Sequence, residues 1–248
     1  KQFKVINDPL QRVELHFAGS GRMLLSKKCH GRLIRPSRVY GVTDGYNNAI
    51  YSDDDGSTWE VSKPFPMKAS GEGSIIELSD GRLLYHSRVH WFSSNQTTTH
   101  NKWVAESYDC GVNWTNLRMD QYIPDGPTYR NIDKGHGPSH QGHFGLMGDI
   151  AKLELNGNEI LIYSNVDSKN GLRKGLTLWL SYDNGETWPI KKLVHPGPSA
   201  YSSLAVIQNH KYPLESIILV LFEGGISQEY EGGFLARLNL KWLLEVTN

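Results

Sequence analysis

The stretch Ser52-Asp-Asp-Asp-Gly-Ser-Thr-Trp59 recurs in this chain as Ser107-Tyr-Asp-Cys-Gly-Val-Asn-Trp114 and again as Ser181-Tyr-Asp-Asn-Gly-Glu-Thr-Trp188. The copies share the pattern S-x-D-x-G-x-[T/N]-W, and we name them box 1, box 2 and box 3 in chain order. A motif that repeats at intervals of several tens of residues is typical of proteins built from repeated structural units. The boxes therefore indicate a fold before they indicate any chemistry.

Each box carries the residues of a β-hairpin turn. Ser and Asp side chains accept hydrogen bonds from backbone N–H groups inside such a turn, and glycine supplies a positive φ. The tryptophan is expected to pack inward as an anchor between adjacent sheets. Because none of these roles requires contact with a substrate, we interpret the boxes as architectural.

Strand pairs around a glycine or asparagine turn accompany the boxes. The clearest pair lies between Ser74 and Arg88, where Asp80-Gly81 is a strong hairpin signal. Comparable pairs span residues 22–39, 150–165 and 203–222, and proline or glycine interrupts every window that could form a helix. The sequence predicts an all-β chain of about four strand-turn-strand units, the first three of them completed by a box hairpin.

About four such units suit a β-propeller, whose blades use roughly 40–50 residues each. One interpretation of the 248 residues is a ring of four blades. The other is a larger ring whose first blades are missing, because no first blade is recognisable before Leu15. We expect residues 1–248 to form a single domain, and a preceding segment or a second chain could complete the larger ring.

Composition argues against several classes of function. The formal net charge is zero, so no basic excess favours nucleic acid as a partner. The longest apolar run, residues 217–222, is too short to cross a bilayer, and the first residues lack the apolar core of a signal peptide. The only cysteines, Cys29 and Cys110, indicate no disulfide framework, although a single bridge stays open.

The chain resembles the exo-sialidase (neuraminidase) family in four stretches. They are Gly31-Arg-Leu-Ile-Arg-Pro36, Glu72-Gly-Ser-Ile-Ile-Glu-Leu-Ser-Asp-Gly-Arg-Leu-Leu-Tyr-His-Ser-Arg88, Arg173-Lys-Gly-Leu-Thr-Leu-Trp-Leu-Ser181 and Ala200-Tyr-Ser-Ser-Leu204. The resemblance runs from about Phe17 to Leu244 and looks like the C-terminal two-thirds of a family catalytic domain. Family members are six-bladed propellers with boxes of this kind, so the resemblance implies a sialidase-type propeller with its N-terminal blades missing.

The same resemblance implies an exo-α-sialidase that releases terminal sialic acid from glycoconjugates by a retaining route without a cofactor. The substrate carries a carboxylate on its anomeric carbon, and guanidinium groups grip such an anion. A carboxylate nucleophile would be repelled there, so the family uses a tyrosine activated by a glutamate. By position in the matching motifs, Tyr201 resembles the nucleophile and Glu72 its base, while Arg88 and Arg173 resemble carboxylate-binding arginines.

Glu223, within Leu219-Val-Leu-Phe-Glu-Gly-Gly225, matches the family glutamate that holds a further arginine at the start of the domain. No motif before Arg22 resembles the one that carries this arginine, and the family's catalytic aspartate lies in the part not covered. Asp44 has no matching context and is a poor substitute. The resemblance therefore implies that this chain alone could be impaired as a catalyst.

Alternatives stay open at this point. Tyr201 could simply cap a strand, and the arginines could form surface ion pairs. The chain could then be a non-catalytic sialoside-binding or protein-recognition propeller, and intramolecular trans-sialidase activity is a variant of the enzyme hypothesis.

Ligands and location follow from the same expectations. His136, His140 and His143 are not expected to bind a metal, because no cysteine or carboxylate completes the cluster, and we expect their loop to rim the pocket. The expected partners are sialylated glycans, glycoproteins or gangliosides. A secreted or lysosomal-type location is favoured over the cytoplasm.

Overall fold

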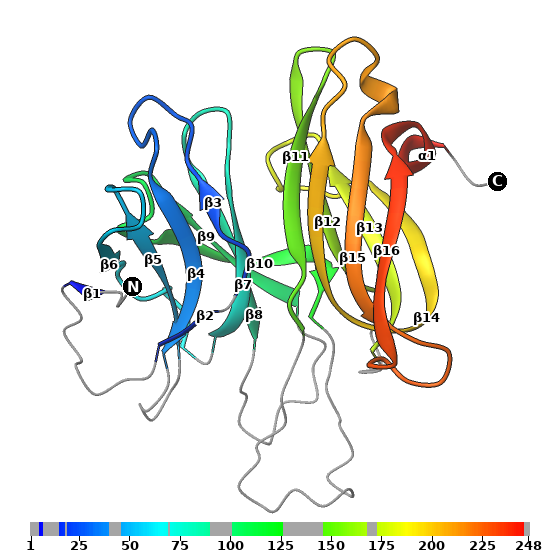
Figure 1. The fold of residues 1–248 in the computed structure, drawn as a ribbon, viewed down its shortest axis with the longest axis horizontal. Coiled ribbons are helices and arrows are strands. Elements are labelled where there is room, and N and C mark those ends of the chain that lie inside the picture. Colours follow the sequence, from blue (N-terminus) through cyan, green and yellow to red (C-terminus); the bar gives the residue numbers. More distant parts are fainter. Residues whose placement is uncertain are drawn as a thin grey trace, which may run out of the picture. The chain divides into compact units, whose positions relative to one another are not determined.

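The computed structural model is built from β-strands almost throughout (Figure 1). It describes residues 5–6, 15–17, 19–39, 46–68, 70–89, 101–125, 146–167 and 173–245. The chain divides into two compact parts: unit 1 comprises Lys1–Thr97, Lys102–Met119 and Tyr129–Phe144, and unit 2 comprises Thr98–Asn101, Asp120–Thr128 and Gly145–Asn248. The expectation of a single domain over residues 1–248 stays a prediction.

The first sheet belongs to unit 1 and surrounds box 1. Its strands lie in the order β1-β6-β5-β4-β2, β3 also pairs with β4, and β1 pairs with β6 in parallel. The strands are β1 (Val5–Ile6), β2 (Leu15–Phe17), β3 (Arg22–Met23), β4 (Leu33–Val39), β5 (Tyr46–Ser52) and β6 (Trp59–Val61).

The second sheet surrounds box 2, and its strands lie in the order β10-β9-β8-β7. They are β7 (Ser70–Glu77), β8 (Leu83–Val89), β9 (Asn101–Ser107) and β10 (Thr115–Pro124). The hairpin predicted around Asp80-Gly81 is confirmed, because β7 pairs antiparallel with β8 and Gly81 has a φ of 84°.

The remaining strands belong to unit 2 and surround box 3. They follow one another in chain order as β11 (Asp149–Leu155), β12 (Asn158–Val166), β13 (Lys174–Ser181), β14 (Ile190–Ile207), β15 (Ile217–Gly224) and β16 (Gly232–Asn239). β14 is 18 residues long. Its first part pairs with β13 and its second part with β15, so two sheets share one continuous strand. The strand pairs predicted at 150–165 and 203–222 are confirmed.

Alternating apolar residues build the core of each unit. In a strand, residues at i, i+2 and i+4 point to one face, and the sequence places large apolar side chains at those positions. Unit 2 buries Leu176, Leu178 and Leu180 of β13 against β12 and β15, and the core of unit 1 is formed by Leu24, Ile34, Ala49, Tyr51, Phe65, Ile75, Leu83, Tyr85, Ala105 and Trp114.

The box turns have the geometry expected from their sequence. In box 1, Ser52 Oγ accepts from the Gly56 N–H at 2.9 Å and Asp54 Oδ1 accepts from the Thr58 N–H at 2.7 Å. The equivalent bonds recur in box 2 and box 3, and the box glycines all have φ between 81° and 85°. Trp114 and Trp188 are buried as predicted, whereas Trp59 is only partly buried.

A disulfide joins Cys29 to Cys110 within unit 1, across a sequence separation of 81 residues. The sequence neither predicted nor excluded this disulfide. The expectation of no helix is wrong at one short segment, α1 (Leu240–Leu244), where Asn239 Oδ1 caps the first turn by accepting from the Trp242 N–H at 2.9 Å. A single 3-10 turn, η1, spans Pro213–Glu215. No helix in the described part of the chain has the length and apolar character needed to cross a membrane.

Candidate active site

Glu72 and Arg88 form an ion pair in unit 1, as neighbours across the β7–β8 hairpin. Arg88 Nη1 donates to Glu72 Oε2. The Arg88 side chain is 2% exposed and that of Glu72 is 17% exposed. Two of the side chains predicted to act on substrate therefore lie together at one place in this unit.

A β-bulge brings Glu72 to Arg88. The register of β7 and β8 shifts between Ser70 and Gly73, and Glu72 lies within this irregular stretch. A Cβ atom on Gly73 would lie 2.4 Å from the carbonyl oxygen of His86 and 2.5 Å from the ring of Tyr85. Only glycine allows this close approach, and bulges of this kind are frequent beside active sites.

His86 lies two residues before Arg88 on β8 and is fully buried. Burial lowers the pKa of His86 to about 3, and the positive charges of Arg118 and Lys102 act in the same direction. Its imidazole is therefore neutral over the ordinary pH range, so His86 adds no positive charge near Arg88.

Arg173, Tyr201 and Glu223 meet in unit 2. The Ser199 N–H donates to the carbonyl oxygen of Arg173 at 2.9 Å, which holds the start of β13 beside β14. The Tyr201 N–H donates to Glu223 Oε2 at 3.2 Å, which fixes the end of β15 beside the same strand. These three predicted residues therefore share one neighbourhood, and Glu223 contacts the backbone of Tyr201.

Bulges also shape this second cluster. The register of β14 and β15 shifts between Ser199 and Ser202, and Tyr201 lies within that stretch. The register of β13 and β14 shifts between Lys174 and Leu176, directly after Arg173. A bulge redirects a side chain out of the regular alternation of a strand. In both units, the predicted residues thus lie where the strands depart from regular pairing.

Two tyrosines flank the guanidinium of Arg173. Its Cζ lies 5.5 Å from the ring centroid of Tyr201 and 5.9 Å from that of Tyr230. Arg173 Nη1 also donates to the hydroxyl of Tyr230. A planar cation held over aromatic faces can still bind a carboxylate through its edge.

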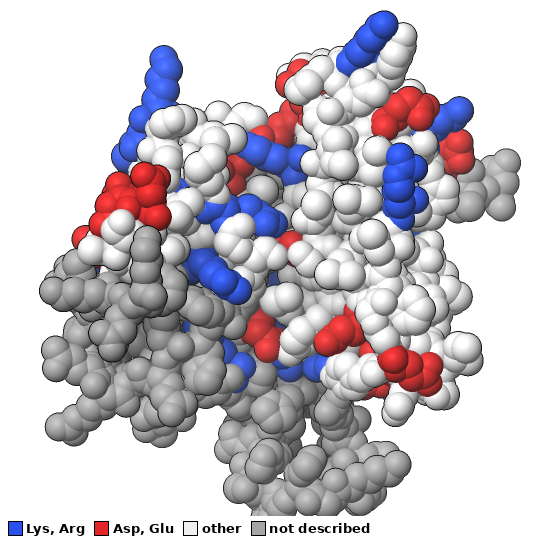
Figure 2. All heavy atoms as spheres, viewed as in Figure 1, with Lys and Arg blue, Asp and Glu red and all other residues white. Residues whose placement is uncertain are grey.

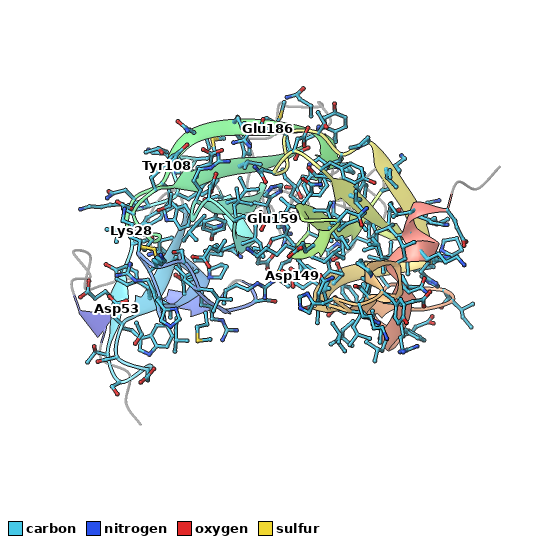
Figure 3. All side chains as sticks on the ribbon, turned by 90° about the horizontal axis from the view of Figure 1, so that it is seen from above. Lys28, Asp53, Tyr108, Asp149, Glu159 and Glu186 are labelled. Carbon is cyan, nitrogen blue, oxygen red and sulfur yellow. A yellow bond between two sulfur atoms is a disulfide. The ribbon has the colours of Figure 1, made fainter. Side chains whose placement is uncertain are left out.

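Sequence reasoning missed Tyr230 and Asp149. Tyr230 lies in the connection between β15 and β16, outside any motif. Asp149 of β11, labelled in Figure 3, is buried, and its Oδ2 accepts from Ser203 Oγ at 3.1 Å and from the Leu204 N–H at 3.0 Å. It anchors β14 close to Tyr201. Neither residue gave a sequence signal, since both act through partners more than fifty residues away.

Charged and uncharged side chains are interspersed on the surface. In the view of Figure 2, lysine and arginine side chains and aspartate and glutamate side chains are visible among uncharged ones on both parts of the molecule. Large apolar side chains are exposed on the last strands of unit 2, among them Leu221, Phe234 and Leu235.

Several predicted features fall outside the described residues. They include Asp44 and the histidines His136, His140 and His143. Within the residues that the structure does describe, no group of three or more His, Cys, Asp or Glu side chains could hold a metal ion. The expectations about the histidine loop, metals and cofactors stay predictions.

Several known proteins that are similar to this chain are sialidases. The model of the BNR repeat-like domain family matches residues 9–212. The sialidase of Micromonospora viridifaciens is 28% identical over 237 residues, which cover 95% of this chain and 32% of that protein. A sialidase of Vibrio cholerae is 28% identical over 201 residues, covering 73% of this chain and 24% of that protein. The chain thus spans about a third or less of these two relatives.

Solved structures agree on the fold. A Hadza microbial sialidase, Hz136, superposes with a TM-score of 0.65 at 20% identity, covering 93% of this chain and 39% of that one. The leech intramolecular trans-sialidase gives a TM-score of 0.66 at 19% identity, covering 92% and 32%. The predicted sialidase-type propeller fold is confirmed, and the chain corresponds to part of such a propeller. By its repeats, its fold and its relatives, the chain belongs to the BNR repeat-like family as a member of the sialidase type.

Proposed function

We propose that this chain is part of an exo-α-sialidase that hydrolyses terminal sialic acid from glycans, glycoproteins or gangliosides with retention of configuration. The observation that carries the proposal is the cluster of unit 2, where Tyr201 leaves the regular strand at a bulge with the Arg173 guanidinium 5.5 Å from its ring. The roles proposed for Glu72 and Arg88, which form an ion pair within unit 1, rest on the family resemblance of their motifs.

The proposed chemistry divides between anion binding and covalent catalysis. Arg88 and Arg173 bind the carboxylate of the sialic acid, which sits on the anomeric carbon. The Tyr201 hydroxyl gives its proton to Glu72 while its oxygen attacks the anomeric carbon, and the glycosidic oxygen departs with a proton from a general acid that we do not assign. Water then attacks the same carbon and gives a proton to the deprotonated form of the unassigned acid. The bond between this carbon and the Tyr201 oxygen breaks, Glu72 returns its proton to the phenolate, and sialic acid is released.

A tyrosine suits this site for an electrostatic reason. A neutral phenol can approach the substrate carboxylate without the repulsion that a carboxylate nucleophile would meet. The adjacent guanidinium favours negative charge as it develops on the phenol oxygen. Glu223 holds the backbone of Tyr201 through its N–H and so supports the orientation of the strand.

Turnover of an aryl sialoside tests the proposal, because an acidic leaving group depends least on a general acid. We expect Tyr201→Phe to lower kcat by at least about 10²–10⁴-fold, the range for loss of a group that acts in the transition state. Tyr212→Phe is the matched control, because Tyr212 is an exposed tyrosine outside the cluster. Equal rates for wild type and Tyr201→Phe would remove Tyr201 as nucleophile.

A sialoside-binding propeller without catalysis is the second candidate. It is favoured by one observation, the ion pair that already engages the Glu72 carboxylate with Arg88, since a paired carboxylate is a weaker base. This candidate predicts that sialic acid binds while the aryl sialoside is not turned over. Analysis of the products separates simple hydrolysis from intramolecular trans-sialidase activity.

A further inference from the structure

The connection between β15 and β16 is organised by one carboxylate. Glu231 accepts from the N–H groups of Ile226 at 2.7 Å, Ser227 at 3.0 Å and Gln228 at 3.1 Å, and also from the Ser227 hydroxyl. Convergence of several donors on a single carboxylate fixes a turn that would otherwise be a flexible exposed connection. We call residues 225–231 the Glu231 turn.

The Glu231 turn is closed tightly at its first residue. A Cβ atom on Gly225 would lie 2.2 Å from the carbonyl oxygen of Gln228 and 2.5 Å from Glu231 Oε2, so no side chain fits there. The Gly225 N–H donates to the carbonyl oxygen of Pro198 at 3.1 Å. The turn is therefore tied to β14 just before Tyr201, and its position relative to the cluster of unit 2 is set by the backbone.

Tyr230 is the residue that the Glu231 turn presents to this cluster. Its hydroxyl accepts from Arg173 Nη1, and its ring centroid lies 5.9 Å from the guanidinium carbon. The Tyr201 ring lies on the same guanidinium at 5.5 Å. Arg173 thus contacts both Tyr201, the proposed nucleophile, and Tyr230, whose position depends on Glu231.

An arginine side chain loses much rotamer freedom when it is fixed against a ligand. Contacts that hold the guanidinium beforehand reduce this loss at the moment of binding, and affinity rises accordingly. From these contacts we infer that Tyr230, held by the Glu231 turn, is a positioning residue for Arg173 and sets the affinity for the carboxylate of an anionic sugar. This inference rests on the proposed function.

Binding of N-acetylneuraminic acid to the full chain, measured by titration in NMR, tests the inference. We expect Tyr230→Phe to keep the ring but lose the acceptor for Arg173, and to weaken binding about ten- to a hundredfold, which corresponds to loss of one charge-assisted hydrogen bond. Tyr212→Phe should bind like wild type. In turnover of an aryl sialoside, KM should rise for Tyr230→Phe while kcat changes little.

The methyl ester of the same sugar supplies a readout that a merely structural role would not move. Because the ester lacks the anion that Arg173 binds, wild type and Tyr230→Phe should bind it with equal affinity. Tyr230→Phe should also cause little further loss of affinity for the acid in an Arg173→Met background, because both substitutions remove the same Arg173–Tyr230 contact. An equal loss of affinity for acid and ester would overturn the positioning role.

Glu231→Gln tests the turn itself. It removes the charge that gathers the N–H donors, so binding of the acid should weaken in the same direction as for Tyr230→Phe. The matched control is Glu215→Gln, an exposed glutamate on η1, and it should leave binding unchanged. If wild type binds no sialic acid, the proposed function fails; if it binds while Tyr230→Phe binds equally well, only the further inference fails.

Discussion

Box 2 differs from box 1 and box 3 at the fourth position of the motif, although the hydrogen bonds of the three turns agree. That position is Asp55 in box 1, Cys110 in box 2 and Asn184 in box 3, and its φ is 56°, 62° and 59°. Asp and Asn tolerate this left-handed conformation through local hydrogen bonding, whereas cysteine has no such preference. In box 2, the disulfide to Cys29 supplies the constraint instead. A bond to a distant residue can therefore replace a local conformational preference.

The tryptophans of the boxes also differ in what they contact. Trp59 Nε1 donates at 3.2 Å to the Gly56 carbonyl oxygen of its own turn. Trp114 Nε1 donates at 3.1 Å to Ser62 Oγ, and Trp188 Nε1 donates at 3.0 Å to Asp120 Oδ2. The tryptophans of box 2 and box 3 therefore donate hydrogen bonds to segments that precede these boxes in the chain, whereas the tryptophan of box 1 donates to its own turn.

The largest expected effect concerns the disulfide, which sets box 2 apart. Closing a loop of 81 residues restricts the unfolded chain, and reduction should lower the free energy of unfolding by about 4.5 kcal/mol in the chain-entropy model. Urea unfolding followed by tryptophan fluorescence, with and without reductant, measures the change. An unchanged midpoint would show that box 2 does not depend on its bridge.

The second prediction compares the anchors. Trp114→Ala should lower the free energy of unfolding by about 4 kcal/mol, because a buried aromatic side chain leaves a cavity. Trp59→Ala should cost only about 1 kcal/mol, since its ring is partly exposed and bonded within its own turn. Denaturant titration of both variants measures the difference. Equal losses in the free energy of unfolding would contradict the inference that Trp114 is a stronger anchor than Trp59.

A smaller effect is expected when the cysteines are replaced. In a Cys29→Ala background, Cys110→Asn should be more stable than Cys110→Ala by about 0.5–1 kcal/mol, because asparagine accepts the left-handed conformation more readily. The replacement gives box 2 the residue that box 3 carries at Asn184. Thermal unfolding of the two double variants checks the order, and a more stable alanine variant would refute the role assigned to φ.

The smallest expected effect is on the stability of the folded protein at low pH, through Asp54 of box 1. The hydrogen bonds from the Thr58 side chain and N–H lower the pKa of Asp54 from 3.8 to about 2. A carboxyl group with a lowered pKa in the folded state stabilises it above pH 3.8, and this contribution is lost as the pH falls toward 2. Asp54→Asn should therefore flatten the stability profile between these pH values. The profile of wild type and variant, measured by urea unfolding, shows whether it does.

The hairpins could be predicted from the sequence because their signals are local. Asp80-Gly81 and Asn156-Gly157 each lie between alternating segments, and the first turn sets the register of the hairpin as far as the pair Gly73–Ser87, beside the bulge that contains Glu72. The chemical roles proposed for Glu72 and Arg88 came from the resemblance to sialidases.

Other contacts could not be predicted because they join residues far apart in the chain. The bridge between Cys29 and Cys110 depends on how two loops pack, and spacing alone does not determine it. Tyr230 reaches Arg173 across a separation of 57 residues, through a turn whose shape depends on Glu231. The bulge at Glu72 could have been predicted in part. Gly71 and Gly73 lie on either side of Glu72, and glycine within a strand often marks a bulge, but the sequence analysis did not use this signal.

The shared strand β14 has a consequence for tolerance to insertions. Box 3 sets where β14 begins, and the same unbroken strand carries Tyr201 into the next sheet. Because each face of a paired strand is fixed by its register, one added residue between Trp188 and Tyr201 would either shift the register of the strand that carries the phenol or require a further bulge. The connection after Ile207, by contrast, can lengthen with little penalty. The number of residues upstream of Tyr201 is therefore constrained by the strand, while the length of the connection downstream is free to vary.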